Sequence, residues 1–422
     1  MNRPMRNPVC ACDDPARTAA LISVETAFAR LGEAVRPLRD YEELRLTDAS
    51  GRVLAAPVTA RAALPPFDNA AMDGYALRAA DLAGDGPWNL PVGARIAAGQ
   101  WPEGPSGGAA RIFTGAPLPA WADTVVMQED VTRRDGGITL PERPPCGSHV
   151  RRAGEIAAQG TELAAAGQRL GPRQIASIAA AGHSTVRVSR RPRAALVITG
   201  DEIRSPDDPR DAAGIWDVNG PLLQTALNAS GAEVSVHHAP DDRAATRSLL
   251  AGLAEEVDLI VTTGGISVGE EDHVRPAMDA LGTRMAFAGV AIKPGKPVCS
   301  GQLGKAHWLG LPGNPVAAFV TWQLFGRHMM NRLQGIDKNT KLTERARCAH
   351  PLQHRAGRAE YRLACIDRTA GPGAITVICP DSRSSGHITW LAQADGLICL
   401  PAPTGDIPAG TELAFLPFGP PD

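Results

Sequence analysis

The sequence has no large excess of either positive or negative charge. Its 43 Lys and Arg residues nearly balance 45 Asp and Glu residues, so the formal net charge is −2. Proteins that bind nucleic acid or an anionic membrane surface through charge usually carry a basic excess, and we expect neither partner. Long apolar runs are missing too, since none approaches the roughly 18–20 residues that a membrane-spanning helix needs.

Cysteines with the spacing of a metal site are also lacking. The eight cysteines include no Cys-x-x-Cys pair, and no histidine lies at zinc-site spacing. Cys10 and Cys12 could bind a metal or form a disulfide, although a pair in a tail is more often incidental. Residues 1–17 have no apolar signal core, and we expect a disordered extension there. These features together favour a reducing compartment, the cytoplasm.

Aromatic residues make up only 4% of the chain, whereas its 44 glycines and 36 prolines are spread along the whole length. This composition indicates many turns and short strands, not a low-complexity tail. At 422 residues the chain exceeds the size at which a single hydrophobic core usually stops growing, so we expect more than one domain.

Hydrophobic periodicity divides the chain into regions. A helical repeat of apolar residues predicts a helix over residues 18–38, and short β-like runs from about residue 53 to 150 are typical of a small barrel or sandwich. From Arg193 onward, apolar strands alternate with helices, which predicts βαβ units and a parallel sheet. After about Asn331 short strands return. The expected strands of the α/β region span residues 194–199, 233–237 and 258–263, and its expected helices span residues 221–229 and 243–256.

A glycine-rich loop, residues 262–269, follows one of these strands. Adjacent glycines let the backbone approach a ligand, and a helix starting near Asp272 would attract an anion to its free N–H groups. The loop matches neither a P-loop nor a Gly-x-Gly-x-x-Gly fingerprint. We predict that it holds a phosphorylated small ligand; the alternative is a tight strand-to-helix turn without one. The candidate binding residues are Thr263, Gly264, Gly265, Ser267 and Gly269.

A second loop, residues 311–315, follows another expected strand and should lie beside the first. It carries an expected N-cap, Asn314, and a proline at the first helical position, Pro315. By itself this is ordinary helix-start chemistry. Because ligands bind beyond the carboxyl ends of parallel strands, we expect the loop to form a wall of the pocket, through Pro312, Gly313, Asn314 and Pro315.

Groups of both charge signs are expected around this pocket. Glu202, Asp241 and Asp272 each fall just after a predicted strand, and carboxylates that converge near phosphates are the usual ligands of Mg²⁺. Lys293 and Lys296 lie on a turn stiffened by Pro and Gly, where fixed cations suit phosphate or a metal oxyanion. Phosphoryl-type chemistry needs both sets.

One N-terminal segment, residues 65–75, is too polar for a core strand and too specific for a linker. Asp68 and Asp73 could be turn residues that bond their own backbone. They could also be catalytic carboxylates offered to a site from another domain or subunit. Composition does not decide between these interpretations.

Six motifs together resemble the MoeA/gephyrin E-domain family of molybdopterin molybdenumtransferases, in the order in which that family carries them. The resemblance covers nearly the whole chain after about Thr18. The motifs are Pro66-Phe-Asp-Asn-Ala-Ala-Met-Asp-Gly-Tyr75, Thr114-Gly-Ala-Pro117, Thr199-Gly-Asp-Glu202, Thr263-Gly-Gly-Ile-Ser-Val-Gly269, Ala291-Ile-Lys-Pro-Gly-Lys-Pro297 and Gly310-Leu-Pro-Gly-Asn-Pro315.

The resemblance implies an activity and an architecture. Family members insert molybdate into adenylylated molybdopterin with Mg²⁺, releasing AMP and the molybdenum cofactor. They are elongated homodimers whose active site lies between the α/β domain of one subunit and the N-terminal segment of the other. The implied fold is multidomain α/β plus β, with a parallel-sheet molybdopterin-binding domain, an elongated N-terminal helical/β region, a small β domain and a C-terminal β-barrel-like domain. Contact with a molybdopterin adenylyltransferase is a further expectation.

The implied domain boundaries lie where the pattern of apolar runs and turn residues changes along the sequence. The discontinuous N-terminal domain would comprise residues 18–60 and 151–190, with the small β domain, residues 61–150, inserted in it. The molybdopterin-binding domain would span residues 191–334 and the C-terminal β domain residues 335–422.

The resemblance also implies roles for single residues. Asp73 and Thr114 would come from the partner chain, and Glu202, Asp241 and Asp272 would serve the metal and the diphosphate. Molybdate would be received by the two lysines of the Lys-Pro-Gly-Lys turn and by the last domain. Further residues expected to bind the ligand are Asp217, Arg362 and Ser385.

Three positions depart from the family pattern. Ile156 stands where an acid is expected, and Gly289 stands where a basic residue is common. In the last domain the usual Gly-Arg-x-Glu-Phe-x-Arg ends in Leu363, with Arg362 one place early. Loss of a lysine at 289 would weaken oxyanion binding by roughly 1–3 kcal/mol.

These departures motivate a second hypothesis, a non-catalytic paralogue that binds or carries molybdopterin or the finished cofactor. A third is an enzyme that adenylylates molybdopterin, against which the additional domains weigh.

Overall fold

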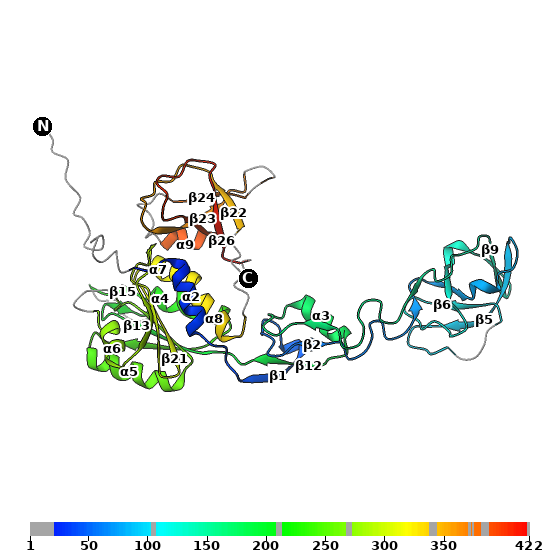
Figure 1. The fold of residues 1–422 in the computed structure, drawn as a ribbon, viewed down its shortest axis with the longest axis horizontal. Helices are drawn as coiled ribbons and strands as arrows, with labels where there is room; N and C mark the ends of the chain where they lie inside the picture. The colour runs from blue at the N-terminus through cyan, green and yellow to red at the C-terminus, as the bar shows by residue number, and fades with distance from the viewer. Residues whose placement is uncertain are drawn as a thin grey trace. The chain divides into compact units, whose positions relative to one another are not determined.

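The computed structural model describes residues 21–102, 107–207, 213–266, 272–336, 344–369, 373, 375–380 and 388–419 (Figure 1). It divides into two compact units. One contains the chain up to Tyr41 and everything from Ser189 onward, and the other spans Glu42–Val188. Among the helices in these ranges, none combines the length and the apolar character needed to cross a membrane.

The first unit is built on a six-stranded mixed sheet with the strand order β16-β13-β17-β21-β20-β18. The first four strands of this order run parallel, and β20 and β18 continue the sheet in antiparallel fashion. The strands are β13 (Arg193–Thr199), β16 (Glu233–Ala239), β17 (Leu259–Thr263), β18 (Arg284–Ala288), β20 (Cys299–Leu303) and β21 (Ala306–Leu311). The predicted parallel α/β region is therefore confirmed, with an antiparallel edge.

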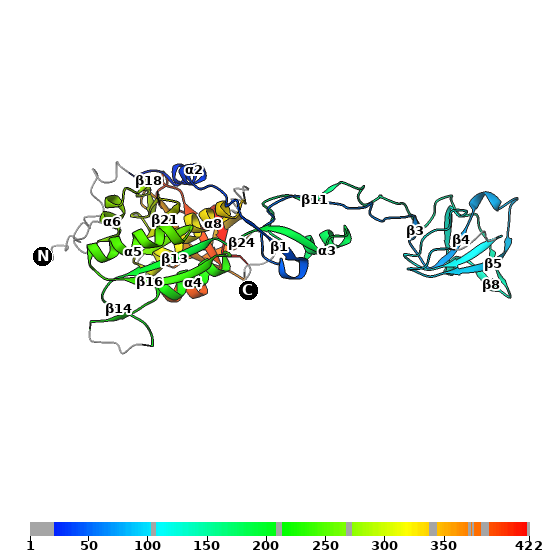
Figure 2. The ribbon, with the colours of Figure 1, turned by 90° about the horizontal axis from the view of Figure 1, so that it is seen from below.

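Helices cover both faces of this sheet (Figure 2). Along β13, Leu196 and Ile198 pack into one core with α2, α4, α7 and α8, whereas Ala195 and Val197 pack into a second core with α5 and α6. Burial on both faces explains the unbroken apolar run of this strand. The helices are α2 (Val24–Ala34), α4 (Asn219–Ala229), α5 (Arg243–Glu256), α6 (Val274–Ala280), α7 (Pro315–Thr321) and α8 (Arg327–Leu333).

Helix α2 is shorter than the helix predicted over residues 18–38. It begins after Ser23, whose side-chain oxygen accepts a hydrogen bond from the backbone N–H of Thr26 at 3.1 Å. It ends at Ala34, and the next residue, Val35, has extended backbone angles. Before the helix, Ile22 forms a parallel bridge with Val290. The apolar residues just outside both ends of α2 pack on the same core as the helix. The sequence pattern therefore predicted a longer helix, although the backbone of these flanking residues is not helical.

A second sheet closes the C-terminal part of this unit. Its strand order is β19-β23-β24-β22-β26-β25, and an additional pairing of β23 with β25 joins the sheet into a barrel. The expectation of a barrel-like C-terminal domain is confirmed. The elements are β19 (Ile292–Lys293), β22 (Glu344–Cys348), β23 (Ala359–Ile366), β24 (Ile375–Ile378), α9 (Ile388–Gln393), β25 (Gly396–Leu400) and β26 (Glu412–Pro417).

The second unit contains a six-stranded sheet with the order β7-β4-β6-β5-β9-β8, as the short β-like runs predict. Its strands are β4 (Gly74–Leu77), β5 (Trp88–Ile96), β6 (Ala109–Ile112), β7 (Thr124–Met127), β8 (Thr132–Arg134) and β9 (Gly137–Leu140). Two-stranded ladders pair β2 (Val58–Thr59) with β11 (Glu162–Ala164) and β3 (Asn69–Ala70) with β10 (Val150–Arg151). Helix α3 spans Pro172–Ala180.

Asp258 fixes the start of β17 in the first unit. Its carboxylate accepts hydrogen bonds from both terminal nitrogens of Arg190, at 2.7 and 2.8 Å, and from the backbone N–H of Arg193 at 2.8 Å. Burial alone would raise the pKa of Asp258, but the bonds from Arg190 and Arg193 hold that pKa below its usual value. The ionised carboxylate therefore stabilises the fold above the pKa of an unfolded aspartate, about 3.9.

Substitution of Asp258 by Asn is expected to lower the free energy of unfolding by roughly 1.5–3 kcal/mol at neutral pH, because charge-assisted hydrogen bonds are lost. The difference from the wild type should shrink as the pH falls through the lowered folded pKa, where the wild-type carboxylate is protonated as well. Denaturant unfolding at several pH values measures this difference in the free energy of unfolding. Asp40→Asn is the control, since the exposed Asp40 carboxylate contacts Nε of Arg190 at 3.0 Å. An equal loss in both variants would contradict the prediction.

Candidate functional site

A cavity of about 380 Å³ opens at the carboxyl ends of β13, β17 and β21. Parallel strands end at one edge of the sheet, and the loops that follow them surround the cavity there. The structure brings together most of the pocket residues predicted from sequence: Thr263, Gly264, Gly265, Gly313, Pro315, Glu202, Asp217, Asp241 and Asp272 all line it.

The two adjacent glycines of the first loop are required by its geometry. Gly264 and Gly265 have φ values of 87° and 63°, in the left-handed region. A Cβ atom on Gly264 would lie 2.5 Å from Oγ1 of Thr199, and one on Gly265 would lie 2.8 Å from Cγ2 of Val274. The loop can therefore fit closely against β13 and α6 only without side chains. Ser267 and Gly269 lie outside the described residues.

Asn219 joins the two loops, and the sequence reasoning missed it. Its side-chain nitrogen donates to Oγ1 of Thr263 and to the backbone oxygen of Gly313, both at 2.8 Å. The neighbouring Asp217 accepts a hydrogen bond from the backbone N–H of Gly220 at 2.8 Å and so caps α4. A signal was available, because Asn219 stands two residues after a predicted site acid and two residues before a predicted helix.

The second loop has the expected helix-start chemistry. The side-chain oxygen of Asn314 accepts from the backbone N–H of Ala317 at 3.1 Å, and Pro315 is the first residue of α7. The carbonyl oxygen of Pro312 accepts a hydrogen bond from the Thr263 hydroxyl at 3.1 Å. The second loop is thus bonded directly to the first, as well as through Asn219.

Carboxylates line the cavity without forming a closed metal cage. Asp241 is held by a reciprocal pair of bonds, since the backbone N–H of Asp201 donates to Asp241 at 2.9 Å and that of Asp241 donates to Asp201 at 3.2 Å. Glu202 and Asp272 reach the same cavity from other loops. In the part of the chain that the structure describes, no three His, Cys, Asp or Glu side chains are grouped closely enough to hold a metal ion by themselves.

Of the two lysines predicted to bind an oxyanion, Lys293 is the last residue of β19 and Lys296 lies in the turn after it. Nζ of Lys293 is 3.2 Å from a carboxylate oxygen of Glu360, on strand β23 of the barrel. Arg362, expected to bind the ligand, is buried, and its Nε donates to the same oxygen at 2.7 Å. Neither Lys293 nor Lys296 belongs to the described residues that line the cavity. Ser385 lies outside the described residues.

In the second unit, Asp73 and Thr114 are bonded to each other. Oδ1 of Asp73 accepts from the backbone N–H of Thr114 at 2.8 Å and from its hydroxyl at 2.7 Å. The backbone hydrogen bond, followed by the hydroxyl, lowers the pKa of Asp73, so the carboxyl is ionised at neutral pH. Asp68 likewise accepts hydrogen bonds from distant groups, the side chain of Arg152 at 2.6 Å and the backbone N–H of Ala153 at 2.8 Å. The interpretation of Asp68 and Asp73 as turn residues that bond their own backbone is therefore wrong.

Comparison with known proteins covers nearly the whole chain. A model of the MoeA N-terminal region, domains I and II, matches residues 22–182, and one of the MoeA C-terminal region, domain IV, matches residues 345–418. Between them, residues 195–332 match a family described as a probable molybdopterin binding domain. A protein of Mycobacterium tuberculosis H37Rv named molybdopterin molybdenumtransferase 2 is 35% identical over 404 residues, 92% of this chain and 97% of that protein.

The chain belongs to the MoeA family. A Nostoc protein named molybdopterin molybdenumtransferase is 33% identical over 388 residues, 90% of this chain and 89% of its own length. Two solved structures of molybdopterin biosynthesis MoeA proteins from Pyrococcus horikoshii match with TM-scores of 0.79 and 0.80, at 29% and 25% identity. Each match covers 94% of this chain and nearly all of the other. The resemblance predicted from the six motifs is thereby confirmed, and so is the multidomain α/β plus β architecture.

The structure accounts for two of the three departures from the MoeA pattern. Gly289 has a φ of 88°, in the left-handed region, and a Cβ atom there would lie 2.8 Å from Cδ2 of Leu21. A basic side chain at this position would therefore strain the backbone and crowd Leu21. Leu363 is buried in the core under the α/β sheet, at the position where the family arginine is common. Ile156, by contrast, is 74% exposed. The side chain that stands where an acid is expected therefore faces solvent within the second unit.

Proposed function

We propose that this chain is a molybdopterin molybdenumtransferase, which inserts molybdate into adenylylated molybdopterin and releases AMP. The observation that carries the proposal is the cavity itself, which four acidic residues and a glycine-rich loop line at the carboxyl ends of parallel strands. Full-length relatives that bear this name support it. Molybdate exchanges oxygen atoms for the two dithiolene sulfurs, so the protein must hold two anionic reactants close together. Positioning and charge stabilisation supply most of the rate in such a reaction.

Magnesium fits the acids of this cavity. Mg²⁺ usually retains several waters and takes only one or two carboxylates, and the remaining positions go to substrate phosphates. Glu202, Asp241 and Asp272 offer oxygen ligands of this type, and they line one cavity without enclosing a cation by themselves. When bound, Mg²⁺ would neutralise charge on the diphosphate that links molybdopterin to AMP. The reciprocal bonds with Asp201 keep the Asp241 carboxylate in place for it.

The remaining residues of the pocket would hold the pterin, phosphate and adenylate groups. The backbone of Gly264 and Gly265 can approach a phosphate closely, because neither residue has a side chain. Asn219 keeps the loops at Thr263 and Gly313 at a fixed spacing. The lysines at 293 and 296 would receive molybdate, together with Ser385. Arg362 would act there through Glu360, since its guanidinium is buried.

We infer that the active protein is a homodimer whose sites are shared between subunits. The paired Asp73 and Thr114 belong to the second compact unit, whereas the cavity belongs to the first. An ionised carboxylate held rigidly by a neighbouring N–H and hydroxyl is suited to orienting a ligand group. Assembly with a molybdopterin adenylyltransferase, which would hand over the adenylylated ligand, stays a prediction.

A single assay tests the function. Purified protein is mixed with adenylylated molybdopterin, Mg²⁺ and molybdate, and AMP release is followed. Molybdate-dependent release is the expected result. Tight ligand binding without AMP release would overturn the proposal and support a carrier of molybdopterin or finished cofactor, the hypothesis that the departures at Ile156, Gly289 and Leu363 motivate. Consumption of ATP with free molybdopterin would indicate an adenylylating enzyme.

Trp216 is expected to stack on a flat ring of the ligand. Its indole is 44% exposed where it lines the cavity, beside the exposed Ile215 and Val218. Stacking of an aromatic side chain on a base contributes about 1–3 kcal/mol, so Trp216→Ala should weaken binding of adenylylated molybdopterin about 5- to 150-fold. Calorimetric titration measures the dissociation constant. Trp216→Phe, which keeps an aromatic face, should lose much less, and equal losses in both variants would argue against stacking.

A further inference from the structure

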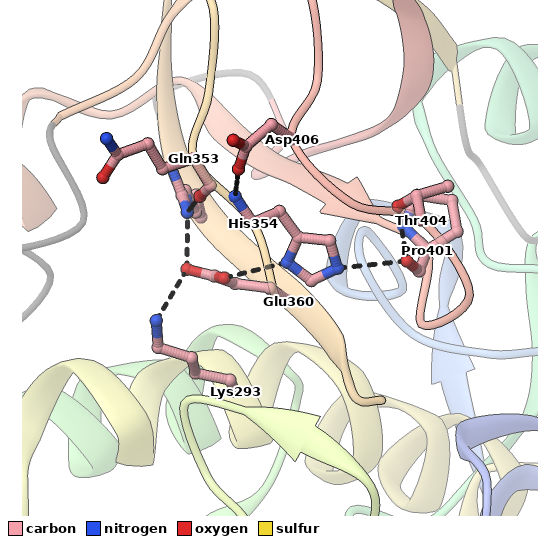
Figure 3. Close-up of polar contacts among 8 residues, drawn as sticks. Lys293, Gln353, His354, Glu360, Pro401, Thr404 and Asp406 are labelled. Atoms are coloured by element: carbon pink, nitrogen blue, oxygen red, sulfur yellow. Dashed lines mark hydrogen bonds and ion pairs between the residues drawn. The ribbon is translucent and has the colours of Figure 1, made fainter. Parts of the chain in front are cut away.

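Glu360 is a buried carboxylate that faces three partners (Figure 3). One oxygen accepts from Nε of Arg362 at 2.7 Å and lies 3.2 Å from Nζ of Lys293, and the other lies 3.2 Å from Nδ1 of His354. Only about 4% of its side-chain surface is exposed. A carboxylate this deeply buried is stable only when it is paired, so the surrounding groups must have a defined arrangement.

The backbone places these groups together. Strand β19 pairs in parallel with β23, and Lys293 stands opposite Glu360 in that register. Side chains two residues apart on a strand share a face, which puts Arg362 on the same side as Glu360. The arginine found one place early in the motif therefore points towards Glu360, and Leu363 points into the core on the other face. The shift of one residue converts the arginine from an expected ligand-binding group into a partner of Glu360.

Arg362 keeps the Glu360 carboxyl ionised. Burial alone would raise the pKa of Glu360, but the hydrogen bond and charge of Arg362, then the charge of Lys293 and the bond to His354, bring that pKa below its usual value. Arg362 also donates to the carbonyl oxygen of Gln353. Its guanidinium is thus held on two sides and cannot turn towards a ligand without breaking both bonds.

His354 fixes the carboxylate from the other side. Its ring lies between two oxygens that can only accept, with Nδ1 3.2 Å from Glu360 and Nε2 3.1 Å from the carbonyl of Pro401. The backbone N–H of His354 donates to Asp406 at 2.8 Å. The ring is about 1% exposed. These contacts tie the Glu360 carboxylate to two loops of the barrel, so its position does not depend on Lys293.

Lys293 stands at the surface end of this network. Its side chain is about 44% exposed, in contrast to the buried Glu360 and Arg362. An ammonium group has three N–H donors, and contact with Glu360 engages one of them. Because Arg362 balances the charge of Glu360, the ion pair does not cancel the attraction of Lys293 for an anion. The long, flexible side chain is therefore held in one position while donors remain for an oxyanion.

We propose that Glu360, braced by Arg362 and His354, is a positioning residue that holds the Lys293 ammonium where molybdate is received. This inference rests on the proposed function, which assigns Lys293 to the oxyanion. Its physical reason is preorganisation, since a lysine already fixed in one rotamer loses less conformational freedom when the oxyanion binds. The carboxylate itself does not touch the reacting atoms.

A double-mutant cycle on the molybdate dependence of AMP release tests the coupling. Glu360→Gln should raise the KM for molybdate about ten-fold, within the range measured for contacting charged pairs, and change kcat much less. In a Lys293→Ala background the same substitution should raise KM by less than about two-fold. Equal effects in both backgrounds would overturn the proposal. Glu412→Gln removes an exposed barrel carboxylate, paired with Arg345 at 3.0 Å, and should leave KM unchanged.

A conservative variant keeps the test usable if Glu360→Gln does not fold. Glu360→Asp retains the negative charge but moves it by one methylene group away from Lys293 and Arg362, which contact the same oxygen. The proposal expects a raised KM for molybdate in this variant, including where a weakened bond to Arg362 lowers the thermal midpoint. A lowered midpoint with wild-type KM would mean that Glu360 only stabilises the barrel, and would overturn the positioning role.

A second readout does not depend on catalysis. The reaction of Lys293 with an amine-specific reagent is followed by mass spectrometry, with Lys305 as the internal reference. Release from the ion pair should speed labelling of Lys293 about five-fold in the Glu360→Asp variant, and Lys305 should not change. Unchanged labelling of Lys293 would overturn the proposal even in an active enzyme. Absence of molybdate-dependent AMP release from the wild-type protein would instead overturn the proposed function.

Discussion

Replacement of Asp272 by asparagine is expected to abolish molybdate-dependent AMP release while leaving the fold intact. The Asp272 carboxylate lines the cavity beside the glycine-rich loop, at the entry to α6. An amide keeps the size of the side chain but removes the charge and the strong ligand for Mg²⁺. Loss of one group that stabilises charge in the transition state costs about 10²–10³-fold in kcat.

The experiment compares two acids of the same region. Asp279 lies on α6, and its half-exposed carboxylate pairs with Nε of Arg275 at 3.1 Å, outside the cavity lining. Asp279→Asn should therefore keep the wild-type rate and lose less than about 1 kcal/mol of stability. For Asp272→Asn, rates measured across a range of Mg²⁺ concentrations separate a weakened metal site from a lost charge. Full activity of Asp272→Asn would remove this residue from the mechanism.

Mixed dimers of two inactive variants are expected to recover activity. Asp73→Asn and Asp272→Asn should each be inactive alone, since one removes the carboxylate bonded to Thr114 and the other an acid of the cavity. If each site takes Asp73 from one subunit and Asp272 from the other, a heterodimer has one intact site and one doubly defective site. Random pairing then leaves about a quarter of all sites intact, and about a quarter of the wild-type rate.

Co-expression of the two variants with different affinity tags yields the heterodimer for this assay. The matched control is a heterodimer of Asp272→Asn with Glu202→Gln, whose substituted acids line the same cavity. The cavity of each subunit then carries one altered acid, so neither site of the heterodimer is intact and no activity returns. Absence of recovery with Asp73→Asn, together with a dimer by light scattering, would contradict the shared site.

Sequence reasoning located the cavity because its residues follow strands. Glu202, Asp241 and Asp272 were predicted as a group from their positions just after apolar strands, and all three line the cavity in the folded chain. The linkage between the loops was not predicted, since Asn219 bonds residues 44 and 94 positions away. Local pattern carries no information on such distant partners. For the same reason, the bond between Asp73 and Thr114 required the fold.

The alternation of side chains along β23 changes how the last motif is interpreted. From sequence alone, Arg362 read as a ligand-binding arginine displaced by one position. A displacement of one residue on a strand moves a side chain to the opposite face, because successive side chains alternate. Burial and the contact with Glu360 then show that Arg362 is a partner of another side chain. Similarly, the left-handed backbone at Gly289 became visible only in the structure.

The sequence by itself determined the family, the α/β and β regions, and the acids and glycines of the cavity, because each depends on residue order over short stretches. The tertiary structure decided which of these groups meet. It placed Glu360 opposite Lys293 through the pairing of β19 with β23, and it turned Arg362 inward. Hydrogen bonds and burial across long separations depend on how strands pair and helices pack, and those contacts are formed only when the whole chain has folded.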